Sequence, residues 1–114
     1  MSRSTNLSEA KLVRAAPVFA ALGDPTRLRL VARLCRDGPL SIARLSESSD
    51  VTRQAVTKHL HALSKAGLVC GRRRGRESIW ELELQRLKLA RASLNQISQQ
   101  WDAAIGRLKA FVEK

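Results

Sequence analysis

Hydrophobic residues recur at every third or fourth position over most of the chain, which is the spacing of amphipathic helices. Capping residues mark where these helices begin and end. Asp24 and Thr52 are residue types that cap helix N-termini, and Gly67 suits the left-handed position that follows a helix. The expected helices span residues 11–22, 25–36, 42–47, 52–66 and 85–112.

The hydrophobic period changes to two residues between positions 68 and 84, where an alternating strand pattern replaces the helical one. Gly75 and Arg76 mark a turn within this segment, so we expect a two-stranded hairpin. Its second strand turns Glu81 and Glu83 to solvent and one apolar face towards the helices. The residues expected on that apolar face are Ser78, Trp80, Leu82 and Leu84, with Trp80 and Leu82 as anchors.

The order of these elements predicts a mainly α fold with a small β-hairpin. Three helices form a core, the hairpin follows as a wing, and a long C-terminal dimerisation helix completes a winged helix-turn-helix. At 114 residues the chain is the size of one domain. We expect a flexible N-terminus at 1–10 and a single domain at 11–114, made of the helix-turn-helix (41–67), the wing (68–84) and the dimerisation helix (85–113).

The chain is strongly basic, with 21 Lys and Arg residues against 10 Asp and Glu residues and a formal net charge of +11. Its sequence pI is about 11.3. A pI above about 9 indicates a nucleic-acid-binding domain. Charge alone also allows a ribosomal or nucleoid-type protein or an anionic membrane surface. Because no signal peptide or membrane span is present, we expect a bacterial cytoplasmic protein that associates with the nucleoid and not with a membrane.

The helix expected at 52–66 has an apolar inward stripe, formed by Val56, Leu60 and Leu63. Its outward stripe is polar and carries no acidic residue. That composition suits the major groove of duplex DNA, where Arg and Lys read guanine and Gln reads adenine. An ordinary solvated helix face is the alternative. We expect Arg53, Gln54, Thr57 and Lys58 to read bases, and Thr52 and His61 to contact phosphates.

Four arginines surround Gly75 at the expected tip of the wing, and Glu77 is their one acidic neighbour. Cations this close together repel one another and need an anion, and guanidinium groups match the geometry of phosphate. A charged tip that only blocks edge-to-edge strand pairing is the alternative. The residues expected to contact phosphates or the minor groove are Arg72, Arg73, Arg74 and Arg76.

The last helix carries a heptad pattern over four repeats. Leu87, Leu94, Trp101 and Leu108 recur every seven residues, and Ala90, Ile97, Ala104 and Phe111 each follow three residues later. The first helix can cover part of this stripe, and a second copy of the chain can cover the rest. Packing only within one chain is the alternative. The expected homodimer interface comprises Leu12, Phe19, Leu94, Ile97, Trp101, Leu108 and Phe111.

Four segments of the chain occur together in a fixed order with matching spacing. They are residues 19–29 (FAALGDPTRLR), 52–60 (TRQAVTKHL), 66–69 (AGLV) and 74–77 (RGRE), the last followed by Trp80 and Leu82. Together they resemble the entry signature, recognition helix, exit and wing of the ArsR/SmtB family of winged-helix repressors. The resemblance covers residues 12–113 and implies a dimeric transcription regulator, often a repressor that a ligand releases from DNA.

Many members of this family sense metals, but two of its known site types lack their ligands here. One type uses a cysteine pair in the helix before the recognition helix, and residues 42–49 contain no cysteine. Another uses Asp and His on the C-terminal helix, which here has Asp102 and no histidine. We therefore expect no metal site and no cofactor, and the sequence does not identify an effector. His59 is expected to pack or to contact a phosphate.

Cys35 and Cys70 lack the spacing of a metal site or of a disulfide framework. Two interpretations stay open for them. They are small buried hydrophobic residues, or they form a thiol redox switch, which some relatives use.

The sequence thus predicts a sequence-specific DNA-binding transcriptional regulator, a repressor that acts as a homodimer on an inverted-repeat operator in double-stranded DNA. The alternatives are a non-specific nucleoid-type DNA-binding protein and a thiol-based redox-responsive repressor. We do not expect an enzyme, because paired carboxylates, a nucleophile motif and a phosphate-binding loop are all missing from the sequence.

Overall fold

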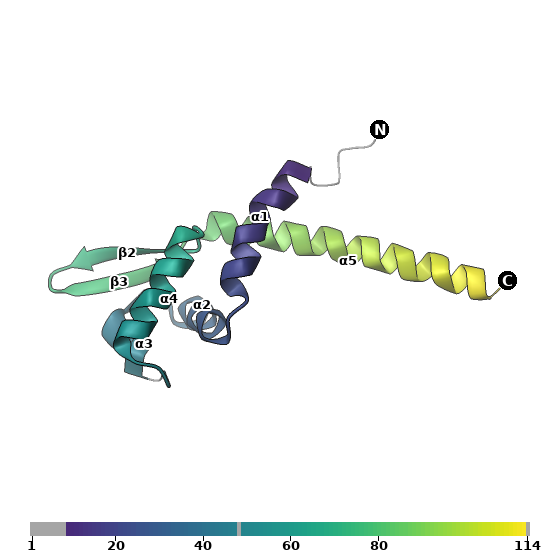
Figure 1. Cartoon of the computed structure of the whole chain (residues 1–114). Helices are drawn as coiled ribbons and strands as arrows, with labels where there is room; N and C mark the ends of the chain where they lie inside the picture. The colour runs from purple at the N-terminus through teal and green to yellow at the C-terminus, as the bar shows by residue number, and fades with distance from the viewer. Residues whose placement is uncertain (1–8, 48, 114) are drawn as a thin grey trace.

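Helices dominate the chain, and the computed structural model describes residues 9–47 and 49–113. Within these residues the helices are α1 (Glu9–Leu22), α2 (Pro25–Asp37), α3 (Ile42–Glu47), α4 (Arg53–Lys65) and α5 (Leu84–Val112), and the strands are β1 (Leu40–Ser41), β2 (Val69–Arg74) and β3 (Glu77–Leu82). Figure 1 shows α2, α3, α4 and the strands gathered at one end of the molecule, while α1 crosses α5 and the rest of α5 extends away. This is a winged helix-turn-helix with a long C-terminal helix.

Helix boundaries lie close to those predicted because the capping residues act as expected. The Asp24 carboxylate accepts hydrogen bonds from the backbone N–H groups of Thr26 at 2.8 Å and Arg27 at 3.1 Å. The bond from Arg27 holds the pKa of Asp24 below its ordinary value of 3.8. Thr52 Oγ1 accepts from the N–H of Ala55 at 3.1 Å and thereby fixes the start of α4.

α1 begins at Glu9 rather than at residue 11. Residues 9 and 10 of the expected flexible N-terminus are therefore helical, and residues 1–8 lie outside the described residues. Pro17 lies inside α1 without ending it, and the helix turns Ala15, Val18 and Ala21 to the interior.

The core lies between α1, α2, α3, α4 and the strands. In α2 the buried side is formed by Leu30, Val31 and Leu34, whereas Leu28 and Ala32 are exposed. Leu28 and Ala32 are each two positions from Leu30, which is about 200° around the helix, so both side chains lie away from it. The buried hydrophobic cluster contains Val18, Ala21, Leu30, Val31, Leu34, Ile42, Leu45, Val56, Leu60, Leu63, Leu68, Val69, Trp80 and Ala90.

The sheet has three strands in the order β1-β3-β2, all antiparallel, rather than the two strands predicted. β1 is two residues long and pairs Leu40 with Trp80 and Ser41 with Ile79. A two-residue strand has no detectable periodicity, and it forms because Gly38, at φ +78°, ends α2 and turns the chain along β3. β3 ends at Leu82, so Leu84 is not on the strand face but starts α5, where it is exposed.

Trp80 anchors the wing to the helices, as its position in the sequence predicted. Only 7% of its surface is exposed. Gly71 lies opposite it in the β2–β3 register, and the ring of His61 on α4 meets the indole edge-on, with 5.6 Å between ring centroids. The absence of a side chain at Gly71 gives the indole the space to lie against β2.

α5 reaches far beyond the rest of the fold. It has 29 residues, and the molecule has a Cα radius of gyration of 18.3 Å, against the roughly 13 Å expected for a compact chain of this length. Its first half packs on α1 through buried Ala90 and Ser93. Beyond that point lies what we call the exposed stripe of α5, formed by Leu94, Ile97, Trp101, Ile105, Leu108, Phe111 and Val112. Leu12 and Phe19 on α1 are half-buried, and Phe19 packs against the core of its own chain.

We expect Gly71→Ala to lower the free energy of unfolding by about 1–3 kcal/mol, the usual cost of overpacking. The reason is that a Cβ at this position would lie 3.1 Å from three atoms of the Trp80 ring. Gly106→Ala is the matched control and should raise the free energy of unfolding by about 0.5–1 kcal/mol, because alanine favours a helix and no atom lies within 4 Å of a Cβ at position 106. Urea unfolding followed by circular dichroism measures both variants, and effects of the same sign would contradict the expectation.

Candidate nucleic-acid interface

α4 presents the outward face that its sequence predicted. Val56, Leu60 and Leu63 are fully buried on its inward side. On the outward side the structure exposes every predicted polar residue except Thr57, which is half-buried. The exposed residues of this face are Arg53, Gln54, Lys58, His61 and Lys65.

Two hydroxyl groups at the start of α4 are already engaged with the backbone. Thr57 Oγ1 donates a hydrogen bond to the carbonyl of Arg53 at 2.9 Å, so its methyl group is the part of the side chain that stays unengaged. Thr52 Oγ1 accepts from Ala55, but a hydroxyl that accepts one bond still has a proton to donate. Thr52 is exposed, so that proton is accessible from solvent.

His61 and His59 have different surroundings. His61 is exposed, and its edge-on contact with Trp80 connects α4 to the wing. His59 is half-buried, and its Nδ1 lies 3.5 Å from a terminal nitrogen of Arg27. The structure therefore places His59 in a packing role, one of the two roles expected for it.

Arg27 is a residue that the sequence analysis missed. Its Nε donates to the carbonyl of Ala21 at 2.7 Å, and its guanidinium also approaches His59. It thus connects the end of α1, the first turn of α2 and the middle of α4. The sequence feature that could have pointed to Arg27 is its position two residues after Pro25, in the first turn of α2. Only the folded chain shows what its guanidinium contacts.

The wing tip carries fewer unpaired cations than expected. Arg72 forms an ion pair with Glu81, with 3.0 Å between Nη2 and Oε2. Glu81 was expected to face solvent unpaired and Glu77 to be the acidic neighbour, but the β2–β3 register places Arg72 diagonally across from Glu81 on one face. Arg73, Arg74 and Arg76 are exposed and take part in no ion pair within the described residues.

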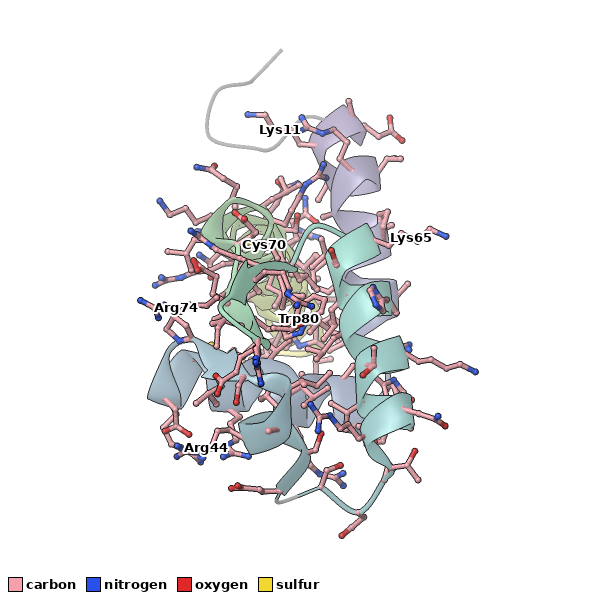
Figure 2. All side chains as sticks on the ribbon, turned by 90° about the vertical axis from the view of Figure 1, so that its left-hand side faces the viewer. Lys11, Arg44, Lys65, Cys70, Arg74 and Trp80 are labelled. Atoms are coloured by element: carbon pink, nitrogen blue, oxygen red, sulfur yellow. The ribbon has the colours of Figure 1, made fainter. Side chains whose placement is uncertain are left out.

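The outward face of α4 and the wing lie at the same end of the molecule. Figure 2 views that end and shows Trp80 between Arg74 on the wing and Lys65 on α4. The polar stripe of α4 and the arginines of the wing therefore lie on either side of Trp80 at this end of the molecule (Figure 2), and the contact between His61 and Trp80 connects the two elements.

Comparisons with known proteins agree with this geometry. A helix-turn-helix domain model matches residues 22–71. The HTH-type transcriptional regulator Rv2034 of Mycobacterium tuberculosis is 36% identical over 87 residues, which cover 76% of this chain and 78% of that protein. The solved structure of an ArsR-like transcriptional regulator from Rhodococcus sp. RHA1 is 33% identical and covers 90% of this chain and 95% of that one, with a TM-score of 0.72.

The chain belongs to the ArsR family. It is a DNA-binding transcriptional regulator with the winged helix-turn-helix fold of that family. The homodimeric winged helix-turn-helix DNA-binding domain Mb0332 from Mycobacterium bovis shares this fold at 24% identity, with a TM-score of 0.62 over 88% of this chain and 91% of that one.

The described part of this ArsR-family protein holds neither a cluster that could bind a metal ion nor a helix that could span a membrane. In residues 9–47 and 49–113 there is no group of three or more His, Cys, Asp or Glu side chains that could hold a metal ion. Over the same residues, no helix has the length and apolar character to span a bilayer.

The two cysteines lie in different environments. Cys35 is exposed, so the interpretation of both residues as buried hydrophobes was wrong for Cys35, which lies on the solvent side of α2. Cys70 is half-buried, and its hydrogen bond to the Glu83 carboxylate, together with burial, raises the pKa of its thiol. A raised pKa leaves less thiolate, the reactive form, and this weighs against Cys70 as a redox sensor.

We expect iodoacetamide to alkylate Cys35 several times faster than Cys70 in the folded protein at mildly alkaline pH. The reason is that Cys35 is exposed, whereas burial and Glu83 disfavour the thiolate of Cys70. Peptide mass spectrometry over time measures both rates, and denatured protein is the control in which the rates should converge. Faster reaction at Cys70 in the folded state would contradict this description of its environment.

Proposed function

We propose that this ArsR-family regulator is a sequence-specific repressor that binds an inverted-repeat operator as a homodimer. The observation that carries the proposal is that the polar outward face of α4 and the cationic tip of the wing lie at the same end of the molecule (Figure 2), connected by the contact between His61 and Trp80. A helix that enters the major groove next to a cationic hairpin contacts base edges and backbone phosphates at once.

In this proposal the N-terminal half of α4 reads the bases. Residues near the N-terminus of the second helix of a helix-turn-helix reach base edges. Arg and Lys pair with guanine, Gln pairs with adenine, and a Thr methyl contacts thymine. The side chain of Thr57 fits this role because its hydroxyl is bound to Arg53 and its methyl is left for the base. The proposed base-reading residues are Arg53, Gln54, Thr57 and Lys58.

The phosphate contacts are proposed for the surroundings of α4. Arg73, Arg74 and Arg76 are exposed on the wing without an acidic partner in the described chain, so their charges are available for phosphates. Arg72 contributes less, because Glu81 already neutralises it. Thr52 and His61 extend these contacts along α4.

The exposed stripe of α5 supports a homodimer. Its apolar residues continue the line of Ala90 and Ser93, which α1 covers, but nothing in the described chain covers the stripe itself. A second copy is the proposed occupant, because it brings the same stripe in the two-fold arrangement that an isologous interface requires. The homodimeric domain from Mycobacterium bovis has the same fold.

A homodimer determines the form of the operator. Two recognition helices related by a two-fold axis bind two half-sites in inverted orientation, about 10–10.5 bp apart or a multiple of this spacing. A dimer bound across a promoter blocks access of the transcription machinery to it, so repression is the proposed outcome.

The non-specific nucleoid-type alternative uses the same charge without reading bases. It predicts equal affinity for operator and random duplex, whereas a specific reader prefers its operator by about 10³-fold or more. The affinity ratio at fixed salt therefore separates the two functions.

We expect Arg73→Ala and Gln54→Ala to weaken DNA binding in different ways. Loss of a phosphate contact at Arg73 should weaken binding to all duplexes and reduce the slope of log affinity against log salt by about 1 for each protomer. Loss of a base contact at Gln54 should cost about 1–3 kcal/mol on the operator and little on random DNA. Fluorescence anisotropy at several salt concentrations measures both.

Lys109→Ala is the matched control for Arg73→Ala, because Lys109 is an exposed cation near the far end of α5. It should leave both affinities unchanged. If Gln54→Ala and Arg73→Ala acted alike on operator and random duplex, the assignment of base-reading and phosphate roles would be wrong.

We expect the wild-type protein to sediment at twice the chain mass of 12.6 kDa and Leu108→Glu to sediment at the chain mass. A charge in the exposed stripe would be buried without a partner in the dimer, which is costly, while the single chain leaves it in water. Analytical ultracentrifugation measures the mass, and circular dichroism checks that helix content is kept. A wild-type protein that stays at the chain mass at micromolar concentration would contradict the homodimer.

A further inference from the structure

A cavity of about 490 Å³ lies between α2 and the turn that leads from α3 into α4. This is within the 300–1,000 Å³ range of small-molecule sites. It is separate from the outward face of α4 and from the exposed stripe of α5, because α2 supplies most of its wall. Neither DNA binding nor dimerisation accounts for it.

The charge around this cavity is mostly positive. Arg29, Arg33 and Arg36 line it from α2, against one acidic lining residue, Asp50. Arg33 and Arg36 both bind Asp37, at 3.3 Å and 3.1 Å, which fixes their positions along the helix. Arg29 takes part in none of the ion pairs found between residues 9–47 and 49–113.

The same cavity has an apolar wall. Leu30 and Leu45 line it, and both are core residues, with 5% and 1% of their surfaces exposed. Ala32 adds a methyl group from the outer side of α2. A ligand that fits must offer an apolar body to the leucines and an anionic group to the arginines, because guanidinium groups bind such oxyanions through paired hydrogen bonds.

We propose that this cavity binds a small organic anion that joins an aromatic or aliphatic body to a carboxylate, sulfonate or phosphate group. A cation-lined pocket with an apolar wall holds such a molecule by two independent contacts, and either one alone would be weak.

Occupation of the cavity should change DNA binding, and this part rests on the proposed function. Ser49 lines the cavity and lies in the turn, where its Oγ accepts from the N–H of Val51 at 3.2 Å. Thr52, one residue further, caps α4. A ligand between α2 and this turn therefore contacts the segment that sets where α4 begins. If the ligand binds one conformation of the turn more tightly than another, it changes the affinity of the protein for its operator.

The site is tested by amide chemical-shift mapping of the ¹⁵N-labelled full chain with naphthalene-1-sulfonate, a probe with an aromatic body and an anionic group. The expected result is a saturable titration with the largest changes at Arg29, Arg33, Ser49 and Asp50. No saturable change would overturn the proposal. So would largest changes along the exposed stripe of α5 or around Ala62, which lines a second cavity of about 350 Å³ between α1 and α4.

Two variants and a control sharpen this test. Arg29→Gln removes the unpaired guanidinium and should weaken probe binding about tenfold, the usual effect of losing a charge-assisted contact. Ala32→Phe fills the cavity from an exposed helix position and should abolish binding while the free energy of unfolding stays unchanged. Arg91→Gln removes an exposed cation from α5 and should have no effect. Equal weakening by Arg91→Gln and Arg29→Gln would overturn the site.

The coupling is tested by measuring operator affinity with and without the probe. The wild-type protein should show a change of at least about fivefold, a typical allosteric factor, and Ala32→Phe should show none. An unchanged wild-type affinity, with mapping that still locates the cavity, would overturn the coupling alone. A wild-type protein that fails to discriminate operator from random DNA would instead contradict the proposed function and leave the mapping result unaffected.

Discussion

The burial of Trp80 against β2 and α4 fixes how the wing lies beside α4. Its indole is enclosed by Gly71 from β2 and by the edge-on ring of His61 from α4. Since β3 is the central strand, paired with β1 on one side and β2 on the other, a shift of Trp80 would move the whole sheet relative to the helices. This packing requires that position 71 carry no side chain. Gly71 and Trp80 together therefore determine how the basic hairpin lies beside α4.

Ion pairs reduce the repulsion between cations on α2 and at the base of the wing, whereas the cations at the wing tip are unpaired in the described chain. Asp37 binds Arg33 and Arg36 on α2, and Glu81 binds Arg72 at the base of the wing tip. Arg73, Arg74 and Arg76 at the wing tip project into solvent, where water and salt screen their charges. In the proposed complex, phosphates take the place of that solvent. A net charge of +11 is thus compatible with a stable fold and leaves unpaired cations where DNA would lie.

The small size of the body limits how much of α5 it can cover. The buried residues of α5 are Ala90 and Ser93, and this helix of 29 residues, which packs on α1, continues well past them. The side chains beyond it keep the apolar heptad pattern although they are in water in the single chain. The same length that leaves this stripe uncovered also separates it from the wing (Figure 1), so the proposed surface for a second chain and the proposed surface for DNA do not overlap.

The sequence by itself determined the element order, the helix caps and the inward stripe of α4, because periodicity and capping are local properties that depend on residues a few positions apart. Asp24, Thr52 and Gly67 therefore fixed helix ends that the structure confirms. The tertiary structure alone decided the pairing of β1 with β3, the ion pair between Arg72 and Glu81, the contacts of Arg27 and the cavity beside α2. Each of these features joins residues that strand register or helix packing brings together. Register and packing produce no periodic pattern in the sequence, so the sequence could not predict these contacts.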